Sequence, residues 1–159
     1  MALITTRFAH VNLVARDWRR LASFYEEALG CRPVPPERHL EGEWLSRATG
    51  VADAELEGVH LRLPGGGDSG PTLEVFQYNA VVEDRLPPAA NRKGFSHIAF
   101  EVDDVEAALD TVRAHGGTAI GEVVSRDISG SGRITFAYAR DPEDNIIELQ
   151  QWDTGDASA

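Results

Sequence analysis

The stretch that decides the fold is Gly94-Phe-Ser-His-Ile-Ala-Phe-Glu-Val-Asp-Asp104. Its residues alternate as in an extended strand, with Ile98, Phe100 and Val102 on one face and His97 on the other. The aliphatic row predicts that this strand packs on an apolar layer, while His97 points to the opposite side of the sheet. The aspartate pair then ends the strand, and Asp104 offers an N-cap for a following helix.

The same design occurs earlier in the chain, at Phe8–Asp17. There His10 lies opposite the face formed by Val11 and Leu13, and the segment again closes with an aspartate. His10 precedes Asp17 by seven residues, as His97 precedes Asp104. Such self-similarity predicts a duplicated structural unit.

Each copy continues with a helical pattern and three further strand patterns, so we expect two tandem βαβββ units. Helical spacing covers Trp18–Leu29, ended by Gly30, and recurs from Val105 to the glycine pair 116–117. The stretch 37–58 lacks clear periodicity and is predicted to be a loop or short helix, a candidate substrate lid, after a strand that ends at Pro35-Pro36. The expected organisation is a single domain over residues 1–159: module one at 6–79, a linker at 80–93, module two at 94–153 and a disordered tail at 154–159.

The last strand of each copy carries a glutamate between aliphatic neighbours, Glu74 in the first and Glu148 in the second. Together with the two strand histidines they form four polar groups on faces opposite the aliphatic ones. A carboxylate on an inward face is costly to bury without a partner, and one divalent cation would serve all four groups. Imidazole and carboxylate donors suit Zn, Ni, Co, Mn or Fe, and four ligands on a six-coordinate ion leave two positions for neighbouring substrate oxygens. The histidines without a counterpart in the other copy, His39, His60 and His115, are interpreted as surface or structural residues.

Composition narrows the class of function. The net charge of −11 argues against nucleic-acid binding, which needs a basic surface. No apolar run approaches the roughly 20 residues that span a membrane, and the first residues lack the pattern of a signal peptide. The single cysteine, Cys31, fits a reducing compartment. We therefore expect a cytoplasmic protein with a small-molecule substrate, no membrane or nucleic-acid partner, and no organic cofactor.

The chain resembles the vicinal oxygen chelate superfamily, which includes glyoxalase I, methylmalonyl-CoA epimerase, extradiol dioxygenases and bleomycin-resistance proteins. The resemblance covers residues 8–152. It implies an α+β fold whose curved mixed sheets enclose a metal-binding cleft, and it commonly goes with a homodimer. His10, Glu74, His97 and Glu148 match the metal ligands of the family; Asp144 stands where its turn commonly has glycine. The segments that carry the resemblance are His10–Leu13, Phe24-Tyr25, Leu29-Gly30, Leu73-Glu74, Gly94–Phe100, Val102–Asp104, Asp141-Pro142 and Asn145–Leu149.

The glyoxalase and epimerase branch is the nearest one. It implies a metal-dependent lyase, isomerase or epimerase that transfers a proton next to a carbonyl through a metal-stabilised enediolate, with Glu148 or, alternatively, Glu74 as the base. The alternatives are an extradiol Fe(II) dioxygenase using His10, His97 and Glu148, a metal-dependent antibiotic-modifying transferase, and a drug-binding resistance protein. The sequence leaves open the substrate, the metal, the use of glutathione or CoA, and whether the site lies within one chain or across a dimer. Candidate substrate-cleft residues are Asn12, Phe76, Tyr78, Phe136, Tyr138 and Trp152.

Overall fold

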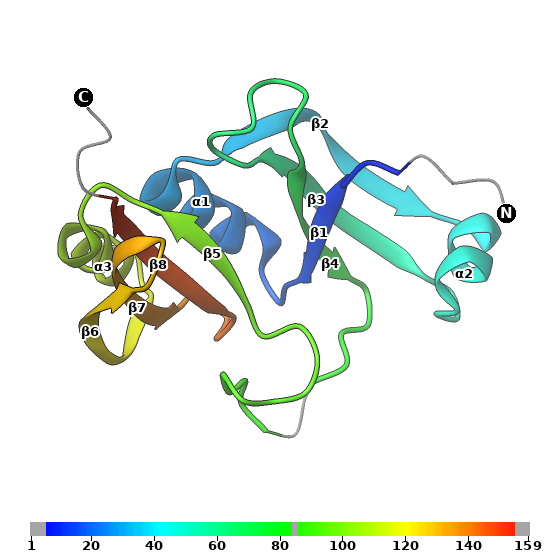
Figure 1. The fold of residues 1–159 in the computed structure, drawn as a ribbon. Coiled ribbons are helices and arrows are strands. Elements are labelled where there is room, and N and C mark those ends of the chain that lie inside the picture. Colours follow the sequence, from blue (N-terminus) through cyan, green and yellow to red (C-terminus); the bar gives the residue numbers. More distant parts are fainter. Residues whose placement is uncertain (1–5, 84–85, 155–159) are drawn as a thin grey trace, which may run out of the picture. The chain divides into compact units, whose positions relative to one another are not determined.

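The structure is a computed structural model that describes residues 6–83 and 86–154. The chain divides into two compact units, and the boundary between them in the sequence lies between residues 83 and 84 (Figure 1). The predicted linker at 80–93 spans this boundary; its residues 84 and 85 lie outside the described residues, as do residues 155–159 of the predicted tail.

Module one contains one mixed sheet of four strands in the order β1-β4-β3-β2. β1 and β4 run parallel, whereas β4–β3 and β3–β2 are antiparallel pairs. Its elements in chain order are β1 (His10–Val14), α1 (Trp18–Leu29), β2 (Arg32–Glu41), α2 (Glu43–Thr49), β3 (Glu55–Arg62) and β4 (Thr72–Tyr78).

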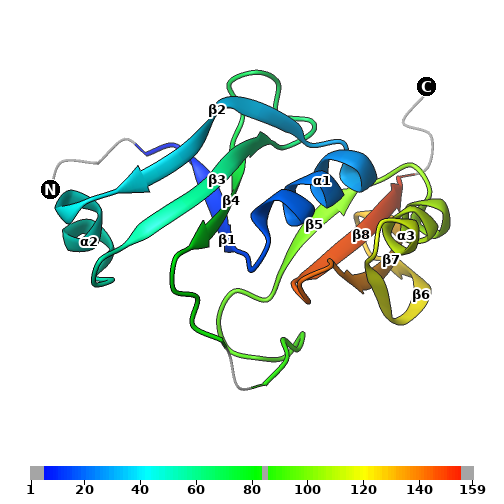
Figure 2. The same cartoon turned by 180° about the vertical axis from the view of Figure 1, so that it is seen from behind.

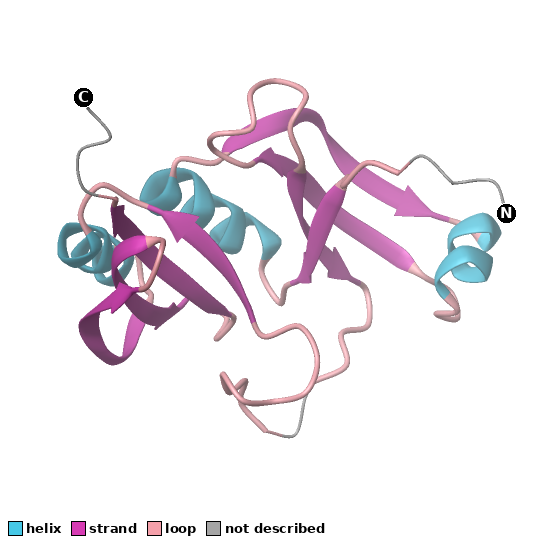
Figure 3. Cartoon of the chain, viewed as in Figure 1, coloured by secondary structure: helices cyan, strands magenta, loops and turns pink. Residues whose placement is uncertain are grey.

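Module two repeats this topology with the strand order β5-β8-β7-β6. β5 and β8 run parallel and the other two pairs are antiparallel. The contacts assign one long helix to each sheet, and Figure 3 distinguishes helices, strands and loops by colour. The predicted α+β fold of two βαβββ modules with mixed sheets is confirmed, with α2 as an addition in module one. The elements of module two are β5 (His97–Glu101), α3 (Val105–Ala114), β6 (Thr118–Ile128), β7 (Gly132–Arg140) and β8 (Ile146–Asp153).

Each helix begins at the aspartate that the sequence indicates. The Asp17 carboxylate accepts a hydrogen bond from the backbone N–H of Arg20 at 3.1 Å, and Asp104 accepts one from Ala107 at 2.9 Å. α1 ends at Gly30, which adopts a left-handed conformation with φ 69°. The sequence signals at the helix starts are therefore confirmed in both modules.

The two long helices, α1 and α3, cover the aliphatic face of their own sheets, as the strand alternation predicts. α1 contacts β3 and β4, and α3 contacts the last three strands of module two (Figure 2). The aliphatic residues that flank the two strand glutamates are fully buried on this face. They are Leu73 and Val75 in β4 and Ile147 and Leu149 in β8. Each glutamate consequently lies on the face opposite the long helix of its module.

The prediction for the segment after α1 was wrong in its extent. β2 does not stop at Pro35-Pro36 but continues to Glu41, and β3 starts at Glu55. The pairing of β2 with β3 shifts register between Val34 and Arg38, so the two prolines, which have no N–H group, lie where the ladder is interrupted. Only a short stretch of the predicted loop remains outside strands, and most of it forms α2.

α2 is a seven-residue helix on one end of the module-one sheet. Its Leu45 packs in a buried apolar cluster with Ala54, Leu56 and Phe76. This packing anchors the helix to β3 and β4. Within the described residues, no helix is long and apolar enough to cross a membrane.

Candidate metal centre

Module one brings His10 and Glu74 together across its parallel strand pair. His10 Nε2 lies 3.4 Å from Glu74 Oε2, and the Asn12 amide donates a hydrogen bond of 3.2 Å to the same oxygen. Glu74 is almost completely buried, with 9% of its surface exposed, whereas the side chain of His10 is half exposed. The carboxylate is thus held inside the module while the imidazole remains accessible.

Module two brings His97 and Glu148 together in the same way. His97 Nε2 lies 3.0 Å from Glu148 Oε2. The ring of Tyr138 packs edge-on against His97, with 5.2 Å between ring centroids. Burial raises the pKa of the Tyr138 phenol, and the Glu148 charge and a hydrogen bond to that carboxylate raise this pKa further.

Strand register makes the two pairs equivalent. Glu74 lies opposite Asn12, two residues after His10, and Glu148 lies opposite Ala99, two residues after His97. The predicted repeat of a histidine on the first strand and a glutamate on the last strand of each module is therefore present in three dimensions.

The donor atoms fit a divalent metal ion. Two ligand atoms about 2.1 Å from an ion lie about 3.0 Å apart at octahedral angles and about 3.4 Å apart at tetrahedral angles. The nitrogen–oxygen separations are 3.4 Å in module one and 3.0 Å in module two. Each histidine–glutamate pair can therefore occupy two neighbouring positions on one ion with little movement. That all four groups bind the same ion stays a prediction.

The sequence interpretation missed His60 as part of the site. His60 Nε2 lies 3.2 Å from Glu74 Oε1, on the oxygen that His10 does not approach. The residue does have a counterpart, contrary to expectation: His60 lies opposite Glu74 in β3, as Tyr138 lies opposite Glu148 in β7. Burial lowers the pKa of the His60 imidazole, although the neighbouring Glu74 charge acts in the opposite direction.

The six predicted substrate-cleft residues all lie on the same sheet face as the glutamate of their module, by strand alternation. Asn12 bonds Glu74 directly, and Phe76 packs edge-on against His60 with 5.7 Å between ring centroids. Phe76 is also buried in the cluster under α2, and Tyr78 packs against that cluster.

In module two, the rings of Phe136 and Tyr138 are in contact, with 6.0 Å between their centroids. Trp152 lies on the neighbouring strand β8, opposite Ile134. Their role as a substrate cleft stays a prediction.

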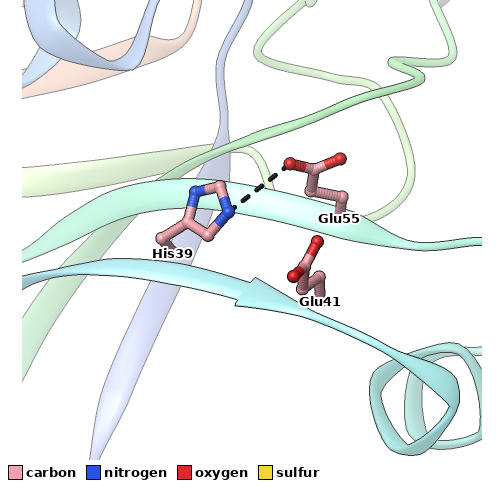
Figure 4. Close-up of side chains that lie close together, drawn as sticks. All are labelled: His39, Glu41 and Glu55. Carbon is pink, nitrogen blue, oxygen red and sulfur yellow. Dashed lines mark ion pairs between the residues drawn. The ribbon is translucent and has the colours of Figure 1, made fainter.

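A second group of metal-capable side chains lies on the other face of the module-one sheet. Figure 4 shows His39 and Glu41 on β2 beside Glu55 on β3, and their ligand atoms lie within 4.8 Å of one another. His39 Nε2 is 3.5 Å from Glu55, and its Nδ1 is 3.1 Å from Glu57. These side chains are largely solvent-exposed, as expected for ion pairs on the protein surface.

The remaining histidine, His115, is the C-cap residue of α3, and its ring hydrogen-bonds the Thr111 carbonyl, which confirms its structural role.

The model of the Glyoxalase/Bleomycin resistance protein/Dioxygenase superfamily matches residues 7–149, which include both histidine–glutamate pairs. The chain belongs to this superfamily. The expected family is thus confirmed.

Relatives within the superfamily are enzymes by name. The chain is 29% identical over 146 residues to a protein of Vibrio parahaemolyticus named "Probable lactoylglutathione lyase", covering 91% of this chain and 90% of that protein. It is 30% identical over 115 residues to the 2-epi-5-epi-valiolone epimerase of an Actinomyces species, covering 70% of this chain and 60% of that protein. A solved structure of a glyoxalase family protein from Bacillus cereus matches the fold with a TM-score of 0.73 at 23% identity, covering 96% of both chains.

Proposed function

We propose that this superfamily member is a metal-dependent enzyme of the glyoxalase and epimerase type, which transfers a proton at a carbon next to a carbonyl group. His10, Glu74, His97 and Glu148 are the ligands of one divalent ion in this proposal. The supporting observation is the repeated histidine–glutamate pair, whose donor atoms lie 3.4 Å and 3.0 Å apart in the two modules. The names of the lyase and epimerase relatives agree with this type of chemistry.

The two glutamates differ in what holds them, and this difference favours Glu148 as the base. Each glutamate faces a polar side chain on the neighbouring strand, His60 for Glu74 and Tyr138 for Glu148. Glu74 in addition accepts a hydrogen bond from Asn12. Ala99 occupies the position in module two that Asn12 occupies in module one, and an alanine side chain has no donor. Glu148 is therefore the carboxylate with more freedom to leave a ligand position and to take a proton from the substrate carbon.

The bound ion would supply Lewis-acid stabilisation of the negative charge on two neighbouring substrate oxygens. The protein residues orient the donors and move the proton. The carboxylate of Glu148 would accept the proton on one side of the reaction and return it to a carbon or oxygen of the product. Glu74, held by Asn12, would remain a fixed ligand. Four protein ligands speak against the dioxygenase alternative, because a fourth ligand would occupy a position that catechol and oxygen need.

Metal analysis tests the ligand assignment. Wild-type protein loaded with Zn²⁺, Ni²⁺ or Co²⁺ and then desalted is expected to retain one ion per four-ligand site, and His97→Ala is expected to retain none. His39→Ala is the matched control, because it removes a histidine from the exposed group on the other sheet face. Retention in His97→Ala together with loss in His39→Ala would place the ion elsewhere and refute the assignment.

Isotope exchange tests the reaction. The metal-loaded enzyme in deuterium oxide is expected to exchange the carbon-bound proton of a reactive member of a panel of α-hydroxyketones and acyl thioesters. Glu148→Gln should slow this exchange by about 10²- to 10⁴-fold while the protein still folds. Oxygen consumption with catechols under ferrous iron, without any proton exchange, would instead support a dioxygenase.

We also propose that the protein is a cytoplasmic homodimer. Light scattering of the purified protein measures its oligomeric state.

A further inference from the structure

Both ring nitrogens of His60 have polar partners. Nε2 lies 3.2 Å from Glu74 Oε1, and Nδ1 lies 3.3 Å from the hydroxyl oxygen of Thr72. Thr72 is buried, and His60 is half-buried beside the Phe76 ring. The imidazole is therefore fixed in direction by contacts on both sides.

The chemistry of these partners determines which nitrogen carries the hydrogen. A carboxylate only accepts hydrogen bonds, so Nε2 must be the N–H that donates to Glu74. In a neutral imidazole Nδ1 is then an acceptor, and the Thr72 hydroxyl, which can donate, satisfies it.

The contacts of Glu74 divide between its two oxygens. Oε1 faces His60, whereas Oε2 faces His10 Nε2 and accepts the Asn12 amide. Held in this way, the carboxylate presents one oxygen together with the His10 nitrogen. This is the arrangement that a metal ligand needs, because a partner outside the coordination sphere fixes which atom faces the ion.

The matched position in module two is a second, independent observation. Tyr138 lies opposite Glu148 just as His60 lies opposite Glu74, and the nearby Glu148 carboxylate contributes to the raised pKa of its phenol. The same strand position therefore carries a side chain that can donate a hydrogen bond and that lies beside the glutamate in both modules, although the residue types differ. A chance surface histidine would have no reason to coincide with this position.

We propose that His60 is a positioning residue of the metal centre: its Nε2–H holds Oε1 of Glu74, so that Oε2 is presented to the ion beside His10, and Thr72 selects the required tautomer. The inference rests on the proposed function and adds a residue that does not itself bind the ion. Outer partners of metal ligands typically contribute 10- to 100-fold to metal affinity.

The test measures the affinity of metal-free protein for Co²⁺ and Zn²⁺ by competition with a chromophoric chelator. His60→Leu should raise the dissociation constant by about 10- to 100-fold. His60→Gln, whose amide can also donate to Glu74, should stay within about threefold of wild type. Thr72→Val should cause a smaller loss than His60→Leu, and His39→Gln should cause none.

The Co²⁺ absorption spectrum is a readout that a merely structural residue would not change. His60→Leu should alter the visible bands, because the carboxylate of Glu74 is no longer held in one orientation. His60→Gln should show the same bands as wild type.

Circular dichroism checks that each variant is folded. If His60→Leu does not fold, the comparison of His60→Gln and Thr72→Val with wild type decides. Wild-type affinity and spectrum in folded His60→Leu, or a full loss in folded His60→Gln, would overturn the inference alone. Absence of metal binding by wild type would overturn the proposed function as well.

Discussion

Cys31 shows how burial sets the chemistry of a single side chain. The residue is 3% exposed just before β2, and burial, aided by the nearby charge of Glu26, raises the pKa of its thiol to about 12 from an ordinary value of 9.0. The folded protein therefore keeps the proton at pH values where the unfolded chain has lost it. The free energy of unfolding should fall as pH rises from about 9 towards 12, by about 1.4 kcal/mol per pH unit.

Urea denaturation at pH 8, 9 and 10.5 checks this expectation. Other groups also titrate in this range, so the informative quantity is the difference between wild type and Cys31→Ala. Wild type should lose about 1.5 kcal/mol more than the variant between pH 9 and 10.5. Equal slopes would show that the thiol ionises in the folded protein as easily as in the unfolded chain.

His60 shows why one residue of the site escaped prediction from the sequence. It precedes Glu74 by 14 residues, whereas Tyr138 precedes Glu148 by 10, so counting along the chain does not align them. The difference of four arises in the connections, which comprise nine residues between β3 and β4 and five between β7 and β8. Only cross-strand register reveals that the positions match. The four histidine and glutamate positions, by contrast, stood out because each lies inside a strongly alternating strand.

At the scale of elements, the two long helices share one starting signal, and their caps should contribute equally. Asp17→Ala and Asp104→Ala each remove a side-chain acceptor for a backbone N–H of the first turn. Each substitution should lower the free energy of unfolding by about 1 kcal/mol. The double variant should lose about the sum, because the two aspartates cap different helices in different modules.

Chemical denaturation followed by far-ultraviolet circular dichroism measures these costs. Asp103→Ala is the matched control, since it removes a neighbouring carboxylate that does not cap α3, and it should change stability by less than about 0.5 kcal/mol. A cost at Asp103 equal to that at Asp104 would mean that general charge, not capping, stabilises the helix.

Elements with regular periodicity were predictable, whereas the segment between α1 and β3 was not. Its three prolines argue against a strand, because proline cannot donate to a ladder. The interruption of the β2–β3 pairing beside Pro35 and Pro36 removes that objection, and it depends on the partner strand. α2 is short, and it is held by Leu45 in a cluster with β3 and β4 residues, so its stability comes from tertiary contacts that local sequence does not encode.

At the scale of the whole molecule, the proposed ion links the stability of both modules to metal concentration. An ion that binds only the folded protein, at 100 times its dissociation constant, stabilises it by about 2.7 kcal/mol. Wild type should therefore gain this stability when Zn²⁺ is added and lose it when the ion is chelated. His10→Ala and His97→Ala should both fail to gain it, although the substitutions lie in different modules.

Thermal or chemical unfolding with and without Zn²⁺ measures this linkage. His115→Gln serves as a control histidine outside both pairs and should respond to the ion as wild type does. Stabilisation that survives in one of the two alanine variants would mean that the ion needs the donors of only one module.

The two modules differ at Asn12 and Ala99 and at His60 and Tyr138, which two identical subunits could not do. Two identical subunits related by a dyad must carry the same residue at every corresponding place. Two modules in one chain are free of that restriction, so one carboxylate can accept a further hydrogen bond, from Asn12, that the other does not have. A chain with two modules can therefore give its two glutamates different roles, whereas a symmetric pair of identical units cannot.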